Sequence, residues 1–241
     1  MKTRGTALFV SVLSFALVVA CGGKKEGGKC KAGESTCMDK QDALVCRNGT
    51  FAKVACNGPL GCTKFQEKAN CDDSIALEGD ACMGVTDEEY ACSPDKKRAL
   101  VCRGGVFAKL LECRGAGGCS QLGTQLSCDT SLAAKGDPCK TQGQVSCTVD
   151  GNEMVICRDG KFVLHRYCRG PKHCTLDHDQ PVCDETISLE GDPCSHQGRV
   201  VCSADGQMEL ICQGSTFLKS RSCRKTGCTV SNAPGHPVVC D

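Results

Sequence analysis

Cysteine is the residue that most constrains this chain, because 25 of its 241 residues are Cys. A fraction this high is typical of a disulfide scaffold and argues against one large aliphatic core. All but one of these cysteines fall into four sets of six with similar internal spacing. The sets are Cys30, Cys37, Cys46, Cys56, Cys62 and Cys71; Cys82, Cys92, Cys102, Cys113, Cys119 and Cys128; Cys139, Cys147, Cys157, Cys168, Cys174 and Cys183; and Cys194, Cys202, Cys212, Cys223, Cys228 and Cys240. The pattern predicts four tandem modules, each with three disulfides.

The first and last cysteines of each set mark the module boundaries. We expect modules at residues 30–71, 82–128, 139–183 and 194–240. Connectors of ten residues join them at 72–81, 129–138 and 184–193, and each contains apolar residues and a Gly-Asp step. Because their length and sequence recur, we expect the connectors to pack against the modules and not to behave as flexible spacers.

A tight hairpin is predicted in every module, between the third cysteine and a phenylalanine that follows it. In the first module the intervening Asn48–Gly49 favours a two-residue turn, because both residues accept positive φ. This turn places Cys46 opposite Phe51 in a non-hydrogen-bonded pair. The recurring phenylalanines are Phe51, Phe107, Phe162 and Phe217. We expect each ring to cover a disulfide.

The residues around this hairpin predict a small disulfide-rich all-β fold. A second turn precedes it, at Asp150–Gly151 in the third module and at Asp205–Gly206 in the fourth. We predict a short antiparallel three-stranded meander in each module, followed by a glycine-containing loop and one final short strand. A module of about 45 residues buries too little surface to fold without its three disulfides.

Disulfide pairing within a module is largely open at this point. Six cysteines allow fifteen pairings, and spacing does not choose among them. The hairpin register directs Cys46 and Cys56 to opposite faces, so we expect only that the third cysteine does not pair with the fourth.

The N-terminus predicts export. The basic Met1–Arg4 precedes an apolar stretch, Ala7–Ala20, that is shorter than the roughly 20 residues needed to span a bilayer. The segment Leu17–Cys21 resembles the lipobox of bacterial lipoproteins, in which the Cys is acylated and becomes the new N-terminus. We therefore expect a signal peptide at 1–20, with lipidated Cys21 and a flexible tether at 21–29. The alternative is an ordinary signal peptide with Cys21 paired to another thiol.

The lipobox together with tandem six-Cys modules resembles uncharacterised Cys-rich repeat lipoproteins of Gram-negative bacteria. Gly22 follows the acylated position, where Asp tends to retain lipoproteins in the inner membrane. The resemblance therefore implies an exported protein that is anchored by lipid on Cys21, in the outer membrane, on its periplasmic or surface-exposed face.

Catalytic, metal and cofactor chemistry is not indicated. The chain has no Cys-x-x-Cys pair, and its five His do not recur at matched positions. Asp150 and Asn152 lack the remaining ligands of a calcium loop and are better interpreted as turn residues. A net charge of +1 argues against a nucleic-acid partner. We expect a non-enzymatic structural or adhesion array whose partner is an acidic polysaccharide or an extracellular or periplasmic protein.

Basic side chains collect on the third strand and the following loop of the last two modules. The residues concerned are Arg166, Arg169, Lys172, Arg221, Arg224 and Lys225. One interpretation is a weak anion-binding ridge whose affinity comes from repetition. The other is a solvated face that protects the sheet edge from aggregation.

Two further functions remain as alternatives. The residues Cys46-x-x-Gly49-x-Phe51, with Cys56-x-Gly58 after them, resemble peritrophin-type chitin-binding modules, which implies binding of chitin or peptidoglycan-like carbohydrate. This chain departs from that family in the wider spacing of Cys37 and Cys46, and we expect it to lack exposed aromatic rings for sugar stacking. The other alternative is a tandem protease inhibitor that presents the longer loop Met83–Ala91 of the second module.

Overall fold

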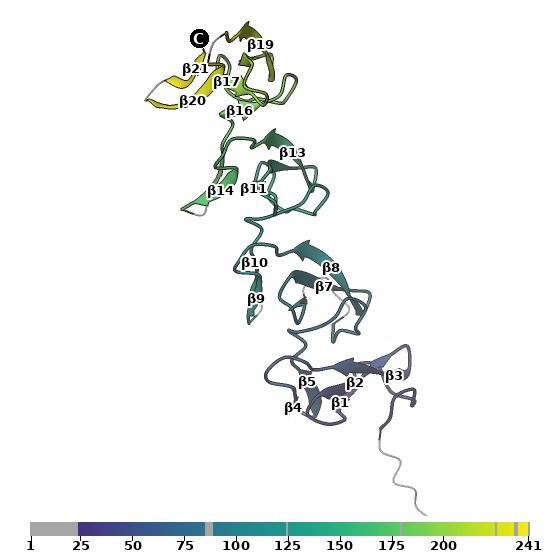
Figure 1. Cartoon of the computed structure of the whole chain (residues 1–241). Helices are drawn as coiled ribbons and strands as arrows, with labels where there is room; N and C mark the ends of the chain where they lie inside the picture. The colour runs from purple at the N-terminus through teal and green to yellow at the C-terminus, as the bar shows by residue number, and fades with distance from the viewer. Residues whose placement is uncertain are drawn as a thin grey trace, which may run out of the picture.

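The chain folds into four small β modules arranged in a row from the N-terminal to the C-terminal end (Figure 1). This computed structural model describes residues 24–84, 89–123, 125–178, 180–224, 226–233 and 236–240. The predicted signal peptide, Cys21 and Lys225 lie outside these residues. All secondary-structure elements of the described residues are strands, which confirms the all-β fold class.

Each module contains the predicted antiparallel three-stranded meander. The meander strands are β1 (Ser35–Cys37), β2 (Asp42–Arg47) and β3 (Thr50–Ala55); β6 (Tyr90–Cys92), β7 (Arg98–Arg103) and β8 (Val106–Glu112); β11 (Val145–Cys147), β12 (Glu153–Arg158) and β13 (Lys161–Tyr167); and β17 (Val200–Ser203), β18 (Met208–Gln213) and β19 (Thr216–Ser222). In the fourth module β16 (Ile187–Ser188) adds a parallel strand to β17.

The segment after the meander differs from the prediction, because it is a two-stranded hairpin and not one final strand. These hairpins pair β4 (Cys62–Phe65) with β5 (Lys68–Cys71), β9 (Cys119–Leu122) with β10 (Gln125–Cys128), β14 (Cys174–Asp177) with β15 (Gln180–Cys183), and β20 (Cys228–Ala233) with β21 (His236–Cys240). Gln66 and Glu67 adopt positive φ in the first of these turns. Neither is a residue that marks such a turn, which is why the sequence did not reveal it.

Disulfide pairing is the same in all four modules: the first cysteine pairs with the third, the second with the fifth, and the fourth with the sixth. The bonds are Cys30–Cys46, Cys37–Cys62 and Cys56–Cys71; Cys82–Cys102, Cys92–Cys119 and Cys113–Cys128; Cys139–Cys157, Cys147–Cys174 and Cys168–Cys183; and Cys194–Cys212, Cys202–Cys228 and Cys223–Cys240. The expectation that the third and fourth cysteines remain unpaired with each other is confirmed.

In the second and third modules two small cores lie on the two faces of the meander, because successive strand residues point to opposite sides. In the third module, Phe162 and Val155 pack on the Cys139–Cys157 disulfide, and Met154 packs with the other two disulfides. The register pairs Phe162 with Cys157, as predicted. The four recurring rings are buried, with exposures of 4% for Phe51, 1% for Phe107, 1% for Phe162 and 0% for Phe217.

The connectors are packed, as expected, and each packs on the module that follows it. Ile75 forms a parallel bridge with Cys92, and Leu132 forms the equivalent bridge with Cys147. The next connector residues, Ala76 and Ala133, are buried. Leu77 is exposed, so only part of the apolar sequence of the connector reaches a core.

Candidate binding grooves at the module junctions

Each connector begins with an aspartate that fastens it to the module before it. Backbone N–H groups of Gly117 and Ser131 donate to the two carboxylate oxygens of Asp129, at 2.8 and 3.0 Å. Burial alone would raise the pKa of Asp129, but these hydrogen bonds hold it below its usual range. A Cβ on Gly115 would overlap the Asp129 carboxyl group, so this close approach requires glycine. Asp72 and Asp184 are bound in the same way.

The residue after this aspartate contacts the first loop of the following module. At the second junction, the Gln144 amide donates to the Thr130 hydroxyl at 2.7 Å. At the third junction, Arg199 pairs with Glu185 at 3.2 Å. At the first junction the corresponding residues are Asp73 and Glu89, whose carboxyl groups share a hydrogen bond. The three junctions therefore have a side-chain contact at the same position, but it is a neutral hydrogen bond in one, an ion pair in another and a pair of carboxyl groups in the third.

A groove opens beside this contact at each of the first two junctions. The groove at the second junction has a volume of about 880 Å³, and that at the first has about 950 Å³. Their walls come from the closing hairpin of one module, from the connector, and from the first loop and the closing hairpin of the next module. Residues of the second groove include Ser127, Leu132, Thr141, Gln144, Val145 and Gln180. Those of the first include Thr63, Asn70, Asp73, Glu89, Tyr90 and Gln121.

Both grooves combine hydroxyl and amide groups with apolar surface. Ser127, Thr141 and Gln180 are exposed in the second groove, and Leu132 and Val145 are half-buried beside them. The first groove adds a half-buried aromatic ring, Tyr90. A concave surface with a few polar groups that fix orientation is the usual form of a small-ligand site.

The aromatic side chains correct one sequence-based expectation. Exposed aromatic rings were expected to be missing, but Phe65 is 66% exposed at the end of β4. Tyr90 lies in the first groove. The recurring phenylalanines, by contrast, are buried against disulfides and cannot reach a sugar. Phe65 lies immediately before the turn of the closing hairpin, and its exposure could not be predicted because that turn was not recognised from the sequence.

Half of the predicted basic ridge is paired with carboxylates. Arg169 makes a bidentate contact with Asp192 of the next connector, at 2.8 and 3.4 Å. Arg114 bridges to Asp137 in the same way at the junction before it. Arg221 pairs with Glu209 within its own module at 3.0 Å. Arg169 thus joins two modules, which sequence reasoning missed because its partner lies 23 residues away.

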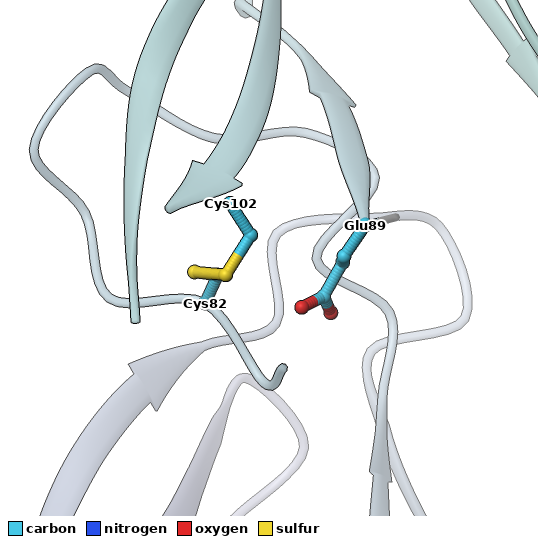
Figure 2. Close-up of side chains that lie close together, drawn as sticks. All are labelled: Cys82, Glu89 and Cys102. Atoms are coloured by element: carbon cyan, nitrogen blue, oxygen red, sulfur yellow. A yellow bond between two sulfur atoms is a disulfide. The ribbon is translucent and has the colours of Figure 1, made fainter. Parts of the chain in front are cut away.

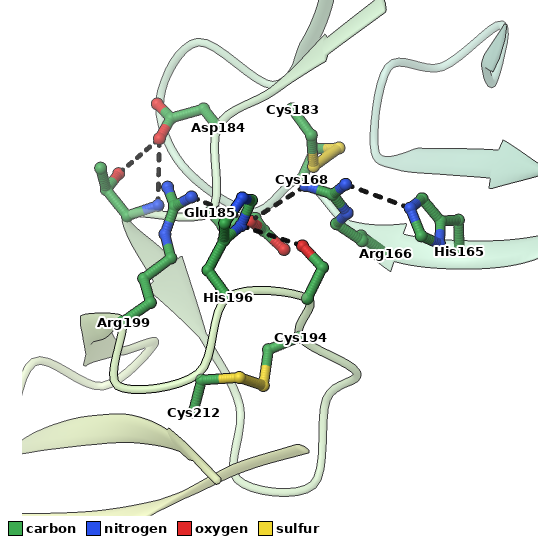
Figure 3. Close-up of polar contacts among 12 residues, drawn as sticks. His165, Arg166, Cys168, Cys183, Asp184, Glu185, Cys194, His196, Arg199 and Cys212 are labelled. Carbon is green, nitrogen blue, oxygen red and sulfur yellow. Dashed lines mark hydrogen bonds and ion pairs between the residues drawn. A yellow bond between two sulfur atoms is a disulfide. The ribbon is translucent and has the colours of Figure 1, made fainter. Parts of the chain in front are cut away.

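Arg166 is also part of a junction (Figure 3). It lies 3.5 Å from Glu185, which also pairs with Arg199. Burial, together with the charge of Arg166, holds the pKa of His165 below its usual range, so this ring adds little positive charge to the ridge. Lys172 and Arg224 are exposed, and the anion-binding interpretation stays a prediction that rests mainly on them.

One group of side chains resembles a set of metal ligands but lacks the chemistry. Glu89 lies beside the sulfurs of Cys82 and Cys102, within 4.8 Å (Figure 2). These two sulfurs form a disulfide and have no thiolate to offer a metal ion. Asp150, in turn, accepts hydrogen bonds from Thr148 and from the Asn152 backbone, which confirms its interpretation as a turn residue.

Comparison with known families adds one finding. Residues 118–174 match the carbohydrate binding domain (family 19). The matched stretch begins in the second module, includes the connector 129–138, and ends in the third module. No curated protein and no solved structure matches the chain. Within the described residues no apolar helix of membrane-spanning length occurs. The twelve disulfides are typical of an extracellular or exported protein. The segment at 118–174 is thus similar to a carbohydrate-binding domain, and it contains most of the second groove.

Proposed function

We propose that this chain is an exported array that binds carbohydrate in the polar grooves at its module junctions. The observation that carries the proposal is the position of the family match. Residues 118–174 include both the connector wall and the first-loop wall of the second groove. A match confined to one module would have favoured a site on a single meander. The match across the junction favours a site between modules.

The groove chemistry supports a sugar ligand. Hydroxyl and amide groups such as those of Thr141, Gln144 and Gln180 can donate to and accept from sugar hydroxyls. Leu132 and Val145 offer apolar surface for the C–H faces of a pyranose ring. Tyr90 offers an aromatic face at the first junction.

Repetition along the chain strengthens the proposal for a polymeric ligand. The first two junctions carry grooves of similar size on one continuous row of modules. A polysaccharide that reaches one groove raises the effective concentration of its next units at the other. A weak site in each groove is then sufficient for retention on an insoluble polymer.

Tethering is a separate part of the proposal. The lipobox-like Leu17–Cys21 and the even number of remaining cysteines support acylation of Cys21. Several acyl chains on one residue would anchor stably, because each buried CH₂ contributes about 0.8 kcal/mol. On this proposal a non-enzymatic array displays its grooves from the outer membrane.

Binding to insoluble chitin, peptidoglycan and cellulose tests the carbohydrate proposal. We expect the four-module chain to sediment with at least one of these polymers. The double substitution Thr141→Ala with Gln180→Ala removes two exposed polar groups from the second groove and should weaken that binding several-fold. The matched control is Thr229→Ala with Gln213→Ala, which removes the same side chains from exposed positions in the fourth module.

Two outcomes would contradict this proposal. Wild-type protein that binds none of the polymers would refute carbohydrate binding of this class. Binding that both double variants retain in full would place the site away from the second groove. Binding to acidic polymers that disappears at physiological salt would favour the ridge at Lys172 and Arg224 instead.

A further inference from the structure

In each of the three connectors, one residue separates the backbone that is hydrogen-bonded to the preceding module from the backbone that is hydrogen-bonded to the following module. Asp72 is fastened to the first module: its carbonyl accepts from Gly58 and its N–H donates to Gly61. Ser74 is fastened to the second module, because its carbonyl accepts from Cys92. Asp73 lies between them and is therefore the residue about which the two modules can turn.

The side chain of this hinge residue is held by the next module in every junction. Thr130 and Glu185 occupy the place of Asp73, and Gln144 and Arg199 occupy the place of Glu89. The second junction thus has a neutral pair and the third an ion pair. The first has two carboxyl groups, with Asp73 only 6% exposed. Two carboxyl groups in hydrogen-bond contact repel one another once both are ionised.

The first junction also lacks a bridge that the other two possess. Arg114 and Arg169 follow the fourth cysteine of their modules and bind Asp137 and Asp192 of the next connector. In the first module that position is Asn57. A different contact crosses this junction: the Arg47 guanidinium donates to the carbonyl oxygens of Cys82 and Gly105. Those neutral acceptors do not respond to pH.

Among the described residues, few other ionisable groups face the acid pair. Among the described residues that line the first groove, Asp72 and Tyr90 are the other titratable ones. Burial would raise the pKa of Asp72, but hydrogen bonds from Ser74 and Leu60 hold it below its usual range, so this carboxyl stays ionised. Met83 N–H donates to Asp73 at 3.0 Å, and Gly84 N–H donates to Glu89. No Lys, Arg or His is among the described residues of this groove.

We propose that the first junction is a pH-dependent hinge, which is closed while the Asp73–Glu89 pair holds a proton and loosened once both carboxyl groups are ionised. The proposal concerns the relative motion of modules 30–71 and 82–128. It does not depend on the ligand of the groove, although the groove shares both residues with the hinge.

The direction of the pH dependence follows from the raised pKa of Asp73. Burial, with the neighbouring Glu89 carboxylate, raises the pKa of Asp73 from 3.8 to about 7 in the closed junction. An open junction exposes this carboxyl to water and returns its pKa toward 3.8. The proton therefore stabilises closure fully below about pH 4, and this stabilisation is lost as the pH rises through about 7.

Residual dipolar couplings of the full four-module chain at pH 5 and pH 8 test the proposal. Couplings give the alignment of each module separately, and they also report whether each module remains folded. At pH 5 all four modules should share one alignment. At pH 8 we expect the first module to lose alignment relative to the second, while the second, third and fourth remain aligned with one another.

Two double variants supply the controls. Asp73→Thr with Glu89→Gln copies the pair of the second junction, and Asp73→Glu with Glu89→Arg copies that of the third. Both should keep the first module aligned at pH 8. The hinge proposal is overturned if wild-type protein keeps a common alignment at pH 8, if all three junctions loosen together, or if the variants retain the pH response of the wild type.

Discussion

Replacement of Phe162 by alanine tests whether the recurring phenylalanine is a structural residue. Phe162 is 1% exposed and packs on the Cys139–Cys157 disulfide. A buried Phe side chain removes about 150–250 Å² from water, which corresponds to about 4–6 kcal/mol at 25 cal/mol per Å². Alanine keeps part of this contribution, and the disulfide limits how far the strands can close over the space. We therefore expect Phe162→Ala to lower the free energy of unfolding of the third module by about 3–5 kcal/mol.

Denaturant unfolding with the disulfides intact, followed through amide signals of the third module, measures this loss. The matched control is Val163→Ala on the same strand, because Val163 points outward and is exposed. We expect that substitution to change stability by about 0.5 kcal/mol or less. If both variants unfold at the same denaturant concentration, the ring does not support the core. If Phe162→Ala is stable but fails to bind carbohydrate, the ring belongs to a binding site.

Three further predictions concern the framework, the third junction and the anchor. Intact-mass measurement of exported protein with and without alkylation should show no free thiol after Cys21, and two or more alkylated sites would contradict the twelve disulfides. Glu185→Gln should lower the stability of the third junction by about 1–3 kcal/mol, because Arg166 and Arg199 lose their shared carboxylate. The control variant Glu190→Gln, at an exposed position, should unfold at the same denaturant concentration as the wild type. Cys21→Ser should abolish labelling by a fatty-acid analogue, and wild-type protein without label would refute the anchor.

The meander and its register could be predicted because their signals are local. Asn48–Gly49 and its counterparts fix a two-residue turn, and the turn alone determines that Phe51 lies opposite Cys46. Disulfide pairing could not be predicted beyond one exclusion. It depends on how the closing hairpin folds back over the meander, and Gln66 and Glu67 give no turn signal.

The junction contacts were missed for a different reason. Thr130 and Gln144 are 14 residues apart, and the corresponding pairs elsewhere are two carboxyl groups or an ion pair. No residue type recurs at these positions, so a search for shared chemistry among the repeats does not find them. Arg169 was noticed as a basic residue, but its partner, Asp192, lies in the next connector. The structure therefore changes its interpretation from surface charge to a contact between modules.

An NMR titration with a soluble oligosaccharide of whichever polymer retains the protein tests the central claim most directly. If carbohydrate binds at the junctions, backbone amides around Thr141, Gln144 and Gln180 should shift together, with one saturation curve, because they line the same groove. Amides near Tyr90 and Asn70 should shift in the same titration if the first groove is also used. Shifts confined to the exposed hairpin end around Phe65, or no shift in either groove at saturation, would contradict the account.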